Sequence, residues 1–166
     1  MYVMVDVEAD GPIPSEYSMI AVGAVVVEPA LDRTFLGYLR PMTSQWIPDA
    51  LKVSGFSRDE VLKFPQPSIT MGHFHTWVKE IDRPVFIADN NGFDWQFVNW
   101  YFHKFLGVNP FGFSSQNLNS LYKGLTRNVR ASFKHLRKTK HDHNPVNDAM
   151  GNAEALLEMR NLGLNF

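Results

Sequence analysis

The chain has 166 residues, 45% of them hydrophobic, and is close to neutral with a formal net charge of -1. This length and apolar content fit one compact domain, which we expect to span residues 1–166. Cysteine is absent, which excludes a disulfide-stapled secreted domain, and the longest apolar run, Met19–Val27, is too short to span a bilayer. We therefore expect a cytoplasmic protein without a membrane association.

The first forty residues read as three strands. Met1–Ala9 is predicted to be a central strand, Ser18–Glu28 follows with a continuous apolar run, and Arg33–Leu39 completes a meander. Because side chains alternate along a strand, Asp6 and Glu8 share one face of the first strand while the valines beside them take the other.

The rest of the chain alternates between helix and strand, which together with the initial meander indicates an α/β sandwich with a mixed sheet. The last helix has the clearest start, with an asparagine N-cap followed by proline at the first helical position. The expected elements are a helix from its N-cap Ser68 to Glu80, a strand Val85–Ala88, a helix Asp94–Leu106 stopped by Gly107, a strand Gln116–Leu118, two further helical stretches, and a helix from Asn144 and Pro145 to near Gly163.

Two carboxylates on an otherwise apolar strand need a compensating charge. Burying Asp6 and Glu8 side by side is costly, and divalent cations that prefer oxygen ligands are the usual compensation. The pair therefore indicates a metal site.

Three motifs in order carry a resemblance to a known family. They are Asp6-Val7-Glu8, then Asn90 to Asp94, then His143 to Asp148, and together they extend over almost the whole chain. In this order they resemble the DEDDh branch of the DnaQ-like, ribonuclease H-like 3′-to-5′ exonucleases. The resemblance implies a ribonuclease H-like three-layer sandwich, with a central mixed β-sheet flanked by helices, in which the separate motifs converge.

The resemblance also implies a reaction: hydrolysis of phosphodiester bonds at the 3′ end of single-stranded DNA or RNA, with release of nucleoside 5′-monophosphates. Two Mg²⁺ or Mn²⁺ ions, about 3.5–4 Å apart in such sites, activate the attacking water and stabilise the leaving oxygen. By analogy with relatives, Asp6 would bridge both ions. Glu8 and Asp148 would hold the ion beside the attacking water, and Asp94 would support the other, partly through water.

A histidine near the third motif is expected to act as the general base, because imidazole titrates near the working pH. His143 precedes Asp148 by five residues, as the family spacing requires, and is preferred. His141 is the competing candidate but lies out of register with that spacing.

Charge is unevenly distributed along the chain. Between Asp94 and Asp142 there are eight basic residues and no acidic one, and the remainder sums to -9. A basic stretch beside a carboxylate site would attract a polyanion, although a solvated basic helix is the simpler alternative. Phosphate contacts are therefore expected from four residues of this stretch, Arg130, Lys134, Arg137 and Lys138.

Contacts to the terminal nucleotide are expected where relatives use the segment after the first motif, here Ala9, Asp10 and Gly11, and from Asn90 in the second motif. Asp10 is equally explained as a turn residue, and Asn90 as a turn cap. Ser54 stands where relatives carry a histidine, so these contacts are expected to differ in detail.

Two other functions fit the same fold. An inactive nucleic-acid-binding module would not need all five site residues, which argues against it. A hydrolase of small nucleotides or dinucleotides would not need the basic stretch. The choice between DNA and RNA depends on how the pocket treats the 2′-hydroxyl, so both stay open here. A homodimer is implied by the resemblance alone.

Overall fold

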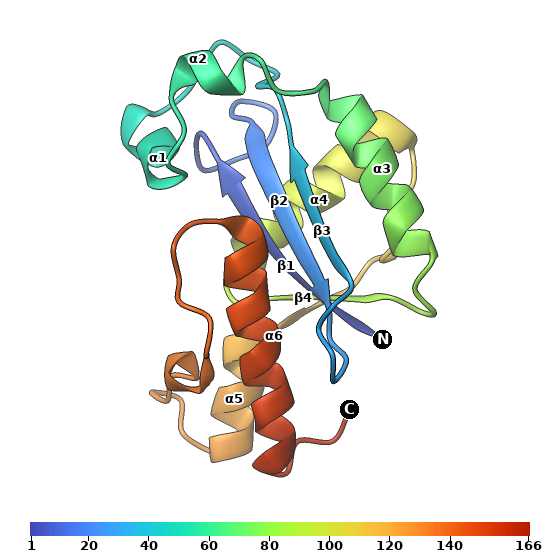
Figure 1. Cartoon of the computed structure of the whole chain (residues 1–166), viewed down its shortest axis with the longest axis vertical. Coiled ribbons are helices and arrows are strands. Elements are labelled where there is room, and N and C mark those ends of the chain that lie inside the picture. The colour runs from blue at the N-terminus through green and yellow to red at the C-terminus, as the bar shows by residue number, and fades with distance from the viewer.

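The computed structural model describes all residues from 1 to 166. Figure 1 shows a twisted sheet with helices packed around it. The strands are β1 (Tyr2–Ala9), β2 (Met19–Val26), β3 (Thr34–Tyr38), β4 (Val85–Ala88) and β5 (Ser115–Asn117). The helices are α1 (Pro48–Val53), α2 (Arg58–Val61), α3 (Pro67–Lys79), α4 (Asn91–Leu106), α5 (Leu118–Thr126) and α6 (Pro145–Asn161), with a 3₁₀ turn at Lys134–Leu136.

The sheet is mixed and has the strand order β3-β2-β1-β4-β5. β2 pairs antiparallel with β1 and β3, whereas β4 pairs parallel with β1 and β5. The first strand is therefore central, as predicted. Its carboxyl end lies at the same edge of the sheet as the carboxyl ends of β4 and β5, so the segments that follow these strands meet there.

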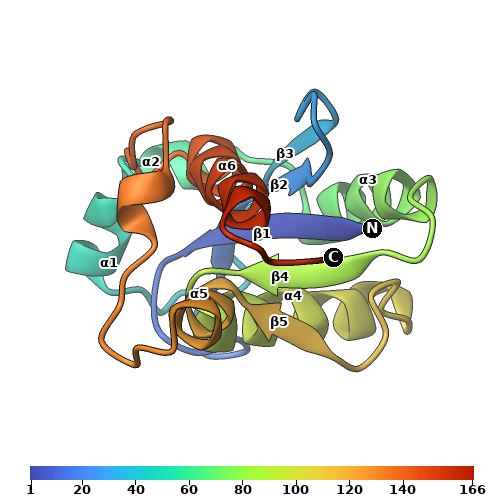
Figure 2. The ribbon, with the colours of Figure 1, turned by 90° about the horizontal axis from the view of Figure 1, so that it is seen from below.

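Two apolar clusters fill the space between the sheet and its helices. One packs α3 and α4 against one face, with Phe74, Phe97 and Tyr101 fully buried. The other packs α5 and α6 against the opposite face, with Leu156 and Met159 fully buried. Figure 2 shows the strands between α6 on one side and α4 on the other. The predicted three-layer sandwich is confirmed. None of the helices is both long and apolar enough to cross a membrane.

The start of the last helix and the end of α4 agree with the prediction. Oδ1 of Asn144 accepts hydrogen bonds from the amides of Val146 at 3.1 Å and Asn147 at 3.4 Å, and Pro145 is the first helical residue. Gly107 ends α4 in the left-handed region, with φ at 70°.

Four predicted features of the elements differ from the structure. α3 begins at Pro67 rather than after Ser68, because proline itself occupies the first helical position. α4 begins at Asn91, so that Asp94 lies inside its first turn instead of at its start. Of the two helical stretches expected before α6, the second is only the 3₁₀ turn Lys134–Leu136. The last strand is also shifted by one residue.

Candidate active site

The first strand presents both of its carboxylates to α6. Asp6 and Glu8 lie on the face that this helix covers, whereas the valines of β1 lie in the core beneath α3 and α4. In the antiparallel register Asp6 is opposite Gly23, and Glu8 is opposite Ala21. The neighbouring strand therefore places little bulk beside the carboxylates.

Gly23 lets the start of α6 approach the sheet. A Cβ atom at this position would lie 2.2 Å from the carbonyl carbon of Pro145 and 2.3 Å from the amide nitrogen of Val146. Only a glycine on β2 is compatible with this distance. The first turn of α6 therefore rests on β2, and Asp148 in that turn is brought to the carboxylates of β1.

Three carboxylates form a close cluster. One oxygen from each of Asp6, Glu8 and Asp148 lies within 4.8 Å of the others. Asp148 is 1% exposed, and its Oδ1 accepts a hydrogen bond from the amide of Asp142 at 3.2 Å. Its Oδ2 lies 2.7 Å from Nδ1 of His141 but receives no well-directed hydrogen bond. A cation between the three carboxylates would supply the missing partner.

Asp94 approaches β1 from the other layer. It is 3% exposed, and its Oδ1 accepts a hydrogen bond from the amide of Val7 at 3.0 Å. Because β4 pairs with β1 only as far as Met4, this carboxylate satisfies an amide beyond the end of that ladder. Asp94 stands outside the close group of three, although its charge still raises the pKa of Asp6.

The carboxylates disfavour one another's ionisation. Burial raises the pKa of Asp6 well above its usual range, and the charges of Asp94, Glu8 and Asp148 raise it further. Burial, followed by the charge of Asp148, raises the pKa of Glu8 from 4.5 to about 7. Burial also raises the pKa of Asp94 well above its usual range. Such shifts are expected where like charges are confined without a counterion.

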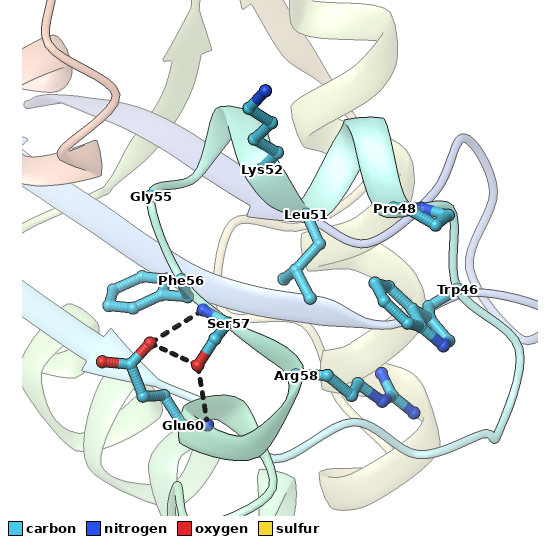
Figure 3. A pocket seen from close by; sticks show the side chains of 9 residues that line it. All are labelled: Trp46, Pro48, Leu51, Lys52, Gly55, Phe56, Ser57, Arg58 and Glu60. Atoms are coloured by element: carbon cyan, nitrogen blue, oxygen red, sulfur yellow. Dashed lines mark hydrogen bonds between the residues drawn. The ribbon is translucent and has the colours of Figure 1, made fainter.

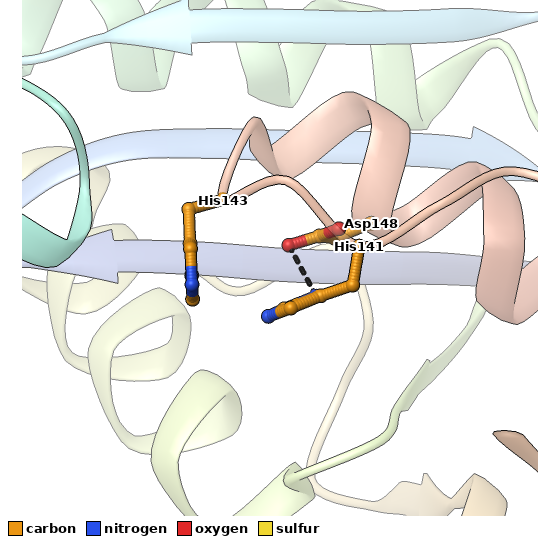
Figure 4. Close-up of side chains that lie close together, drawn as sticks. All are labelled: His141, His143 and Asp148. Carbon is orange, nitrogen blue, oxygen red and sulfur yellow. Dashed lines mark ion pairs between the residues drawn. The ribbon is translucent and has the colours of Figure 1, made fainter.

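Two histidines from the loop before α6 face this cluster, as Figure 4 shows together with Asp148. Nδ1 of His141 lies 2.7 Å from Oδ2 of Asp148, and Nδ1 of His143 lies 3.8 Å from Oε1 of Glu8. The ring centroids are 4.4 Å apart, and the side chains are 49% and 44% exposed. Both histidines considered from the sequence therefore reach the site, each beside a different carboxylate.

Asp142 holds the turn that carries His143, and sequence reasoning missed it. Its Oδ1 accepts from the amide of Asn144 at 3.0 Å, and its Oδ2 accepts from Nδ2 of Asn147 at 2.9 Å. His143 has a φ of 61°, in the left-handed region, where a non-glycine residue costs about 1–2 kcal/mol. The signal in the sequence was an aspartate two residues before the N-cap asparagine, a spacing typical of side-chain-capped turns.

Arg137 belongs to an internal polar network. Its side chain is 10% exposed, its guanidinium donates to Oδ1 of Asn152, and it lies 3.4 Å from Oδ2 of Asp89. Its charge also lowers the pKa of Asp6, against the effects of burial and of the other carboxylates. The expected phosphate contact from Arg137 is not supported by this placement. The network, which includes two residues from outside the motifs, was not foreseen.

The residues after the first motif are mostly buried. Asp10 is fully buried, and its carboxylate accepts from the amide of Ser18 at 2.6 Å and from the guanidinium of Arg58 at 3.0 Å. These contacts hold the Asp10 side chain inside the protein, as the alternative of a turn residue implies. Ala9 and Gly11 are buried as well. Only their backbone is left for a ligand.

Asn90 lies elsewhere on the rim of the site. It is the N-cap residue of α4, but its side chain makes no capping hydrogen bond, and the residue is exposed. Its backbone carbonyl accepts from the amides of Phe93 at 2.8 Å and Asp94 at 3.3 Å. The side chain of Asn90 is therefore free to contact a ligand beside Asp94.

Two of the remaining basic residues border the site. Arg130, Lys134 and Lys138 are all exposed, and Lys134 and Lys138 line a surface hollow of about 410 Å³. The lining of this hollow carries no acidic or apolar side chain. It is lined by Lys134, Arg137, Lys138, Thr139, Lys140 and His141. Because His141 also contacts Asp148, this basic hollow adjoins the carboxylate cluster.

A second hollow, of about 480 Å³, opens between α1 and α2, where Figure 3 shows Trp46 and Arg58 on one side. The guanidinium carbon of Arg58 lies 5.5 Å from the Trp46 ring centroid, and the same side chain pairs with Asp10. Ser54 is buried, and its hydroxyl donates to the carbonyl of Leu51 at 2.6 Å. This segment is tied to the end of β1 but adds no carboxylate or histidine to the cluster.

The donor set of the cluster suits a hard divalent cation. Asp6, Glu8 and Asp148 offer carboxylate oxygens, and no thiolate is present in the chain. The unsatisfied Oδ2 of Asp148 and the raised pKa values of Asp6 and Glu8 are what a carboxylate site produces when no cation neutralises it. These residues therefore fit a hard divalent metal ion.

Comparison with known proteins agrees with this geometry. Residues 3–156 match the family described as Exonuclease. The 3′-5′ DNA exonuclease Cap18 of Escherichia coli is 38% identical over 167 residues, which cover 93% of this chain and 88% of that protein. The chain therefore shares both a family and most of its length with a curated nuclease.

Solved structures share the fold. The nuclease domain of 3′hExo, a DEDDh family member bound to rAMP, superposes with a TM-score of 0.77 at 16% identity, over 98% of this chain and 92% of that one. The Escherichia coli ExoI–ssDNA complex superposes with a TM-score of 0.71 at 16% identity, over 96% of this chain and 40% of that one. With the family match over most of the chain and all five motif residues gathered at one edge of the sheet, the chain belongs to the exonuclease family.

Proposed function

We propose that this protein removes nucleotides from the 3′ end of single-stranded DNA and releases nucleoside 5′-monophosphates. The observation that carries the proposal is the convergence of Asp6, Glu8 and Asp148 within 4.8 Å, with Asp94 and His143 beside them. The 38% identity to a 3′-5′ DNA exonuclease supports DNA over RNA as the substrate.

Exonucleases of this family depend on divalent metal ions. Two Mg²⁺ or Mn²⁺ ions would supply positive charge at the scissile phosphate and make a water molecule more acidic. Asp6 would bind both, as the family resemblance implies, and it lies in the close group with Glu8 and Asp148. Glu8 and Asp148 would hold one ion. Asp94 has one oxygen engaged by the amide of Val7, so it would support the other ion through its second oxygen.

His143 would accept the proton of the attacking water. Its ring stands at the edge of the cluster, 3.8 Å from Glu8, and is 44% exposed, so the accepted proton has a route to solvent. Glu8 lies where it can steady the ring once the ring is charged. A positioned acid or base of this kind contributes about 10²- to 10⁴-fold to the rate.

The path of the strand is proposed from the exposed basic residues. Arg130, Lys134 and Lys138 make no ion pair with another side chain and are free to contact phosphates. Asn90 would contact the nucleotide at the 3′ end, together with the backbone of Ala9 and Gly11, because the amide and the carbonyl of Asp10 already pair with Ser18 and Ile47. The basic hollow favours a polymer over the small-nucleotide alternative, because a mononucleotide would leave it empty.

The test is digestion of matched single-stranded DNA and RNA oligomers. With Mg²⁺ or Mn²⁺, a 5′-labelled DNA should shorten stepwise, and a 3′-labelled DNA should release its label at once as a mononucleotide. RNA should be degraded more slowly. Asp148→Asn should be inactive on both, because it removes one ligand charge from the cluster.

Two results would contradict the proposal. Degradation that persists in excess EDTA would exclude the metal-dependent mechanism. Equal turnover of a dinucleotide and a long oligomer would favour the small-nucleotide hydrolase. A homodimer and a cytoplasmic location stay predictions, and light scattering that gives twice the chain mass of 19.0 kDa would support the first.

A further inference from the structure

His141 lies outside the three family motifs, yet it makes the shortest contact between the loop and the carboxylates. Its Nδ1 is 2.7 Å from Oδ2 of Asp148, whereas Nδ1 of His143 is 3.8 Å from Glu8. Figure 4 shows the ion pair between His141 and Asp148. A nitrogen of His143 lies within 4.8 Å of both groups, but its ion pair is with Glu8. The two histidines therefore pair with different carboxylates and need not share one role.

The backbone on the N-terminal side of His141 is fixed to α6. The carboxylate of Glu154 accepts hydrogen bonds from the amides of Lys138 at 2.8 Å and Thr139 at 2.7 Å, and from the Thr139 hydroxyl at 2.9 Å. Gly151 permits this approach, because a Cβ atom there would lie 2.7 Å from the carbonyl oxygen of Thr139. The histidine is thus attached to a loop that α6 itself holds in place.

Both carboxylate oxygens of Asp148 are contacted by the loop that precedes α6. Oδ1 accepts from the amide of Asp142 at 3.2 Å, and Oδ2 faces His141. One oxygen of Asp148 also lies within 4.8 Å of an oxygen of Asp6 and of Glu8, and Oδ2 has no hydrogen-bond partner of its own, so the carboxylate can still bind a cation while it faces His141. Partners that orient a ligating carboxylate in this way typically contribute 10- to 100-fold to metal affinity.

We propose that His141 is a positioning residue: it orients the Asp148 carboxylate for a divalent cation, and His143 alone acts as the base. This division of labour rests on the proposed function of the site. It predicts that substitutions of the two histidines have different effects. Loss of His141 should weaken cation binding, and loss of His143 should lower turnover.

The test is Mn²⁺ binding to the protein without nucleic acid, followed by electron paramagnetic resonance of the free ion. His141→Ala should weaken the tighter Mn²⁺ by about 10- to 100-fold. His141→Asn should recover part of the loss, because its amide places a donor near the position of Nδ1. His143→Ala should leave the Mn²⁺ affinity within about twofold, and so should His103→Ala, an exposed control on α4.

Turnover at saturating Mn²⁺ provides the second readout. His141→Ala should then approach the wild-type kcat, whereas His143→Ala should stay about 10²- to 10⁴-fold lower. Unchanged Mn²⁺ affinity in His141→Ala would overturn the proposal. If the same variant also had a lower kcat, His141 would be the base. Tighter Mn²⁺ binding would overturn it too, because His141 would then compete with the cation. If Asp148→Asn also bound Mn²⁺ normally, the metal site itself, and with it the proposed function, would fail.

Discussion

Glu8 illustrates how a single carboxylate links the stability of the fold to the need for a cation. Its pKa is raised from 4.5 to about 7 by burial and by the charge of Asp148. An acid with a raised pKa in the folded state stabilises the fold below its unfolded pKa, and this contribution is lost as the pH rises through about 7. The raised pKa values of Asp6 and Asp94 act in the same direction.

We therefore expect the Tm of the protein in EDTA to fall between about pH 5 and pH 8, as measured by scanning calorimetry. Mn²⁺ should restore the Tm at the upper end, because the cation replaces the protons. Glu8→Gln should flatten the pH dependence, and Asp6→Asn should leave the Tm at pH 8 unchanged or raise it. A Tm in EDTA that rises over this range would show that the carboxylates are stabilised by some other partner.

The sequence predicts the five motif residues but not what holds them, and the reason lies in sequence distance. Asp6 and Glu8 are two apart on a strand, so their shared face follows from local geometry. Arg137 is 48 residues from Asp89 and 15 from Asn152, its partners in the structure. A pairing of this kind depends on the tertiary fold, and the basic run read from the sequence alone suggested a phosphate contact instead.

The contact between β2 and α6 is the element-level feature that assembles the site. A methyl group at Gly23 would meet backbone atoms of Pro145 and Val146 at 2.2–2.3 Å, and backbone cannot move aside as a flexible side chain can. We expect Gly23→Ala to destabilise the protein by about 1–3 kcal/mol in urea unfolding. Displacement of Asp148 by about 1 Å should also lower kcat/KM by roughly 10²-fold.

Gly72→Ala is the matched control for this substitution. Gly72 lies within α3, and a Cβ atom there would meet nothing within 4 Å. The change should be neutral or stabilise the protein by about 0.4–1 kcal/mol, with normal activity. If Gly23→Ala behaved like this control, the first turn of α6 would not need its close approach to β2.

The turn after β1 is connected to α2 by the ion pair between Asp10 and Arg58. Asp10 is fully buried and Arg58 is mostly buried, so removal of either partner leaves an uncompensated charge. We expect Asp10→Ala to lower the free energy of unfolding by about 3 kcal/mol. The salt dependence of DNA binding should not change, because the carboxylate faces the protein interior. A changed salt dependence with normal stability would show that the Asp10 carboxylate influences DNA binding after all.

Element boundaries were predictable where a local signal marks them. The side chain of Asn144 caps the first amides of α6, and the ring of Pro145 fixes φ at a helical value, so α6 begins there. α4 has no such signal, because Asn90 makes no side-chain cap, and its first turn is set by the hydrogen bond of Asp94 to β1. α1 was missed because its six residues are too few to show a helical period.

At the scale of the whole molecule, a nearly neutral chain separates its charges in space. The carboxylates gather at the ends of β1, α4 and α6, and the basic loop before α6 borders them. The carboxylates alone would repel a polyanion, whereas a cation held between them and the cationic hollow beside them would attract it. We therefore expect turnover to depend on the length of the substrate.

This arrangement predicts a salt-dependent affinity for long single strands. Each phosphate contact releases counterions, so the logarithm of affinity should fall with the logarithm of salt by about 0.7 per contact. Lys134→Gln with Lys138→Gln should reduce the slope by about 1.4 and raise KM on long oligomers, measured by fluorescence anisotropy and steady-state kinetics. Both side chains are exposed, so the fold should be unaffected.

Arg137 is left unchanged in this double variant. Its side chain is only 10% exposed, so its removal would disturb the contacts with Asp89 and Asn152 as well as any contact with a phosphate. Lys63→Gln with Lys79→Gln removes the same charge from exposed positions outside the basic loop and should change neither slope nor KM. A dinucleotide should be cleaved equally by both double variants, since it is too short to reach the hollow. If the two pairs lowered long-oligomer affinity equally, net charge rather than a binding surface at Lys134–Lys138 would explain the effect.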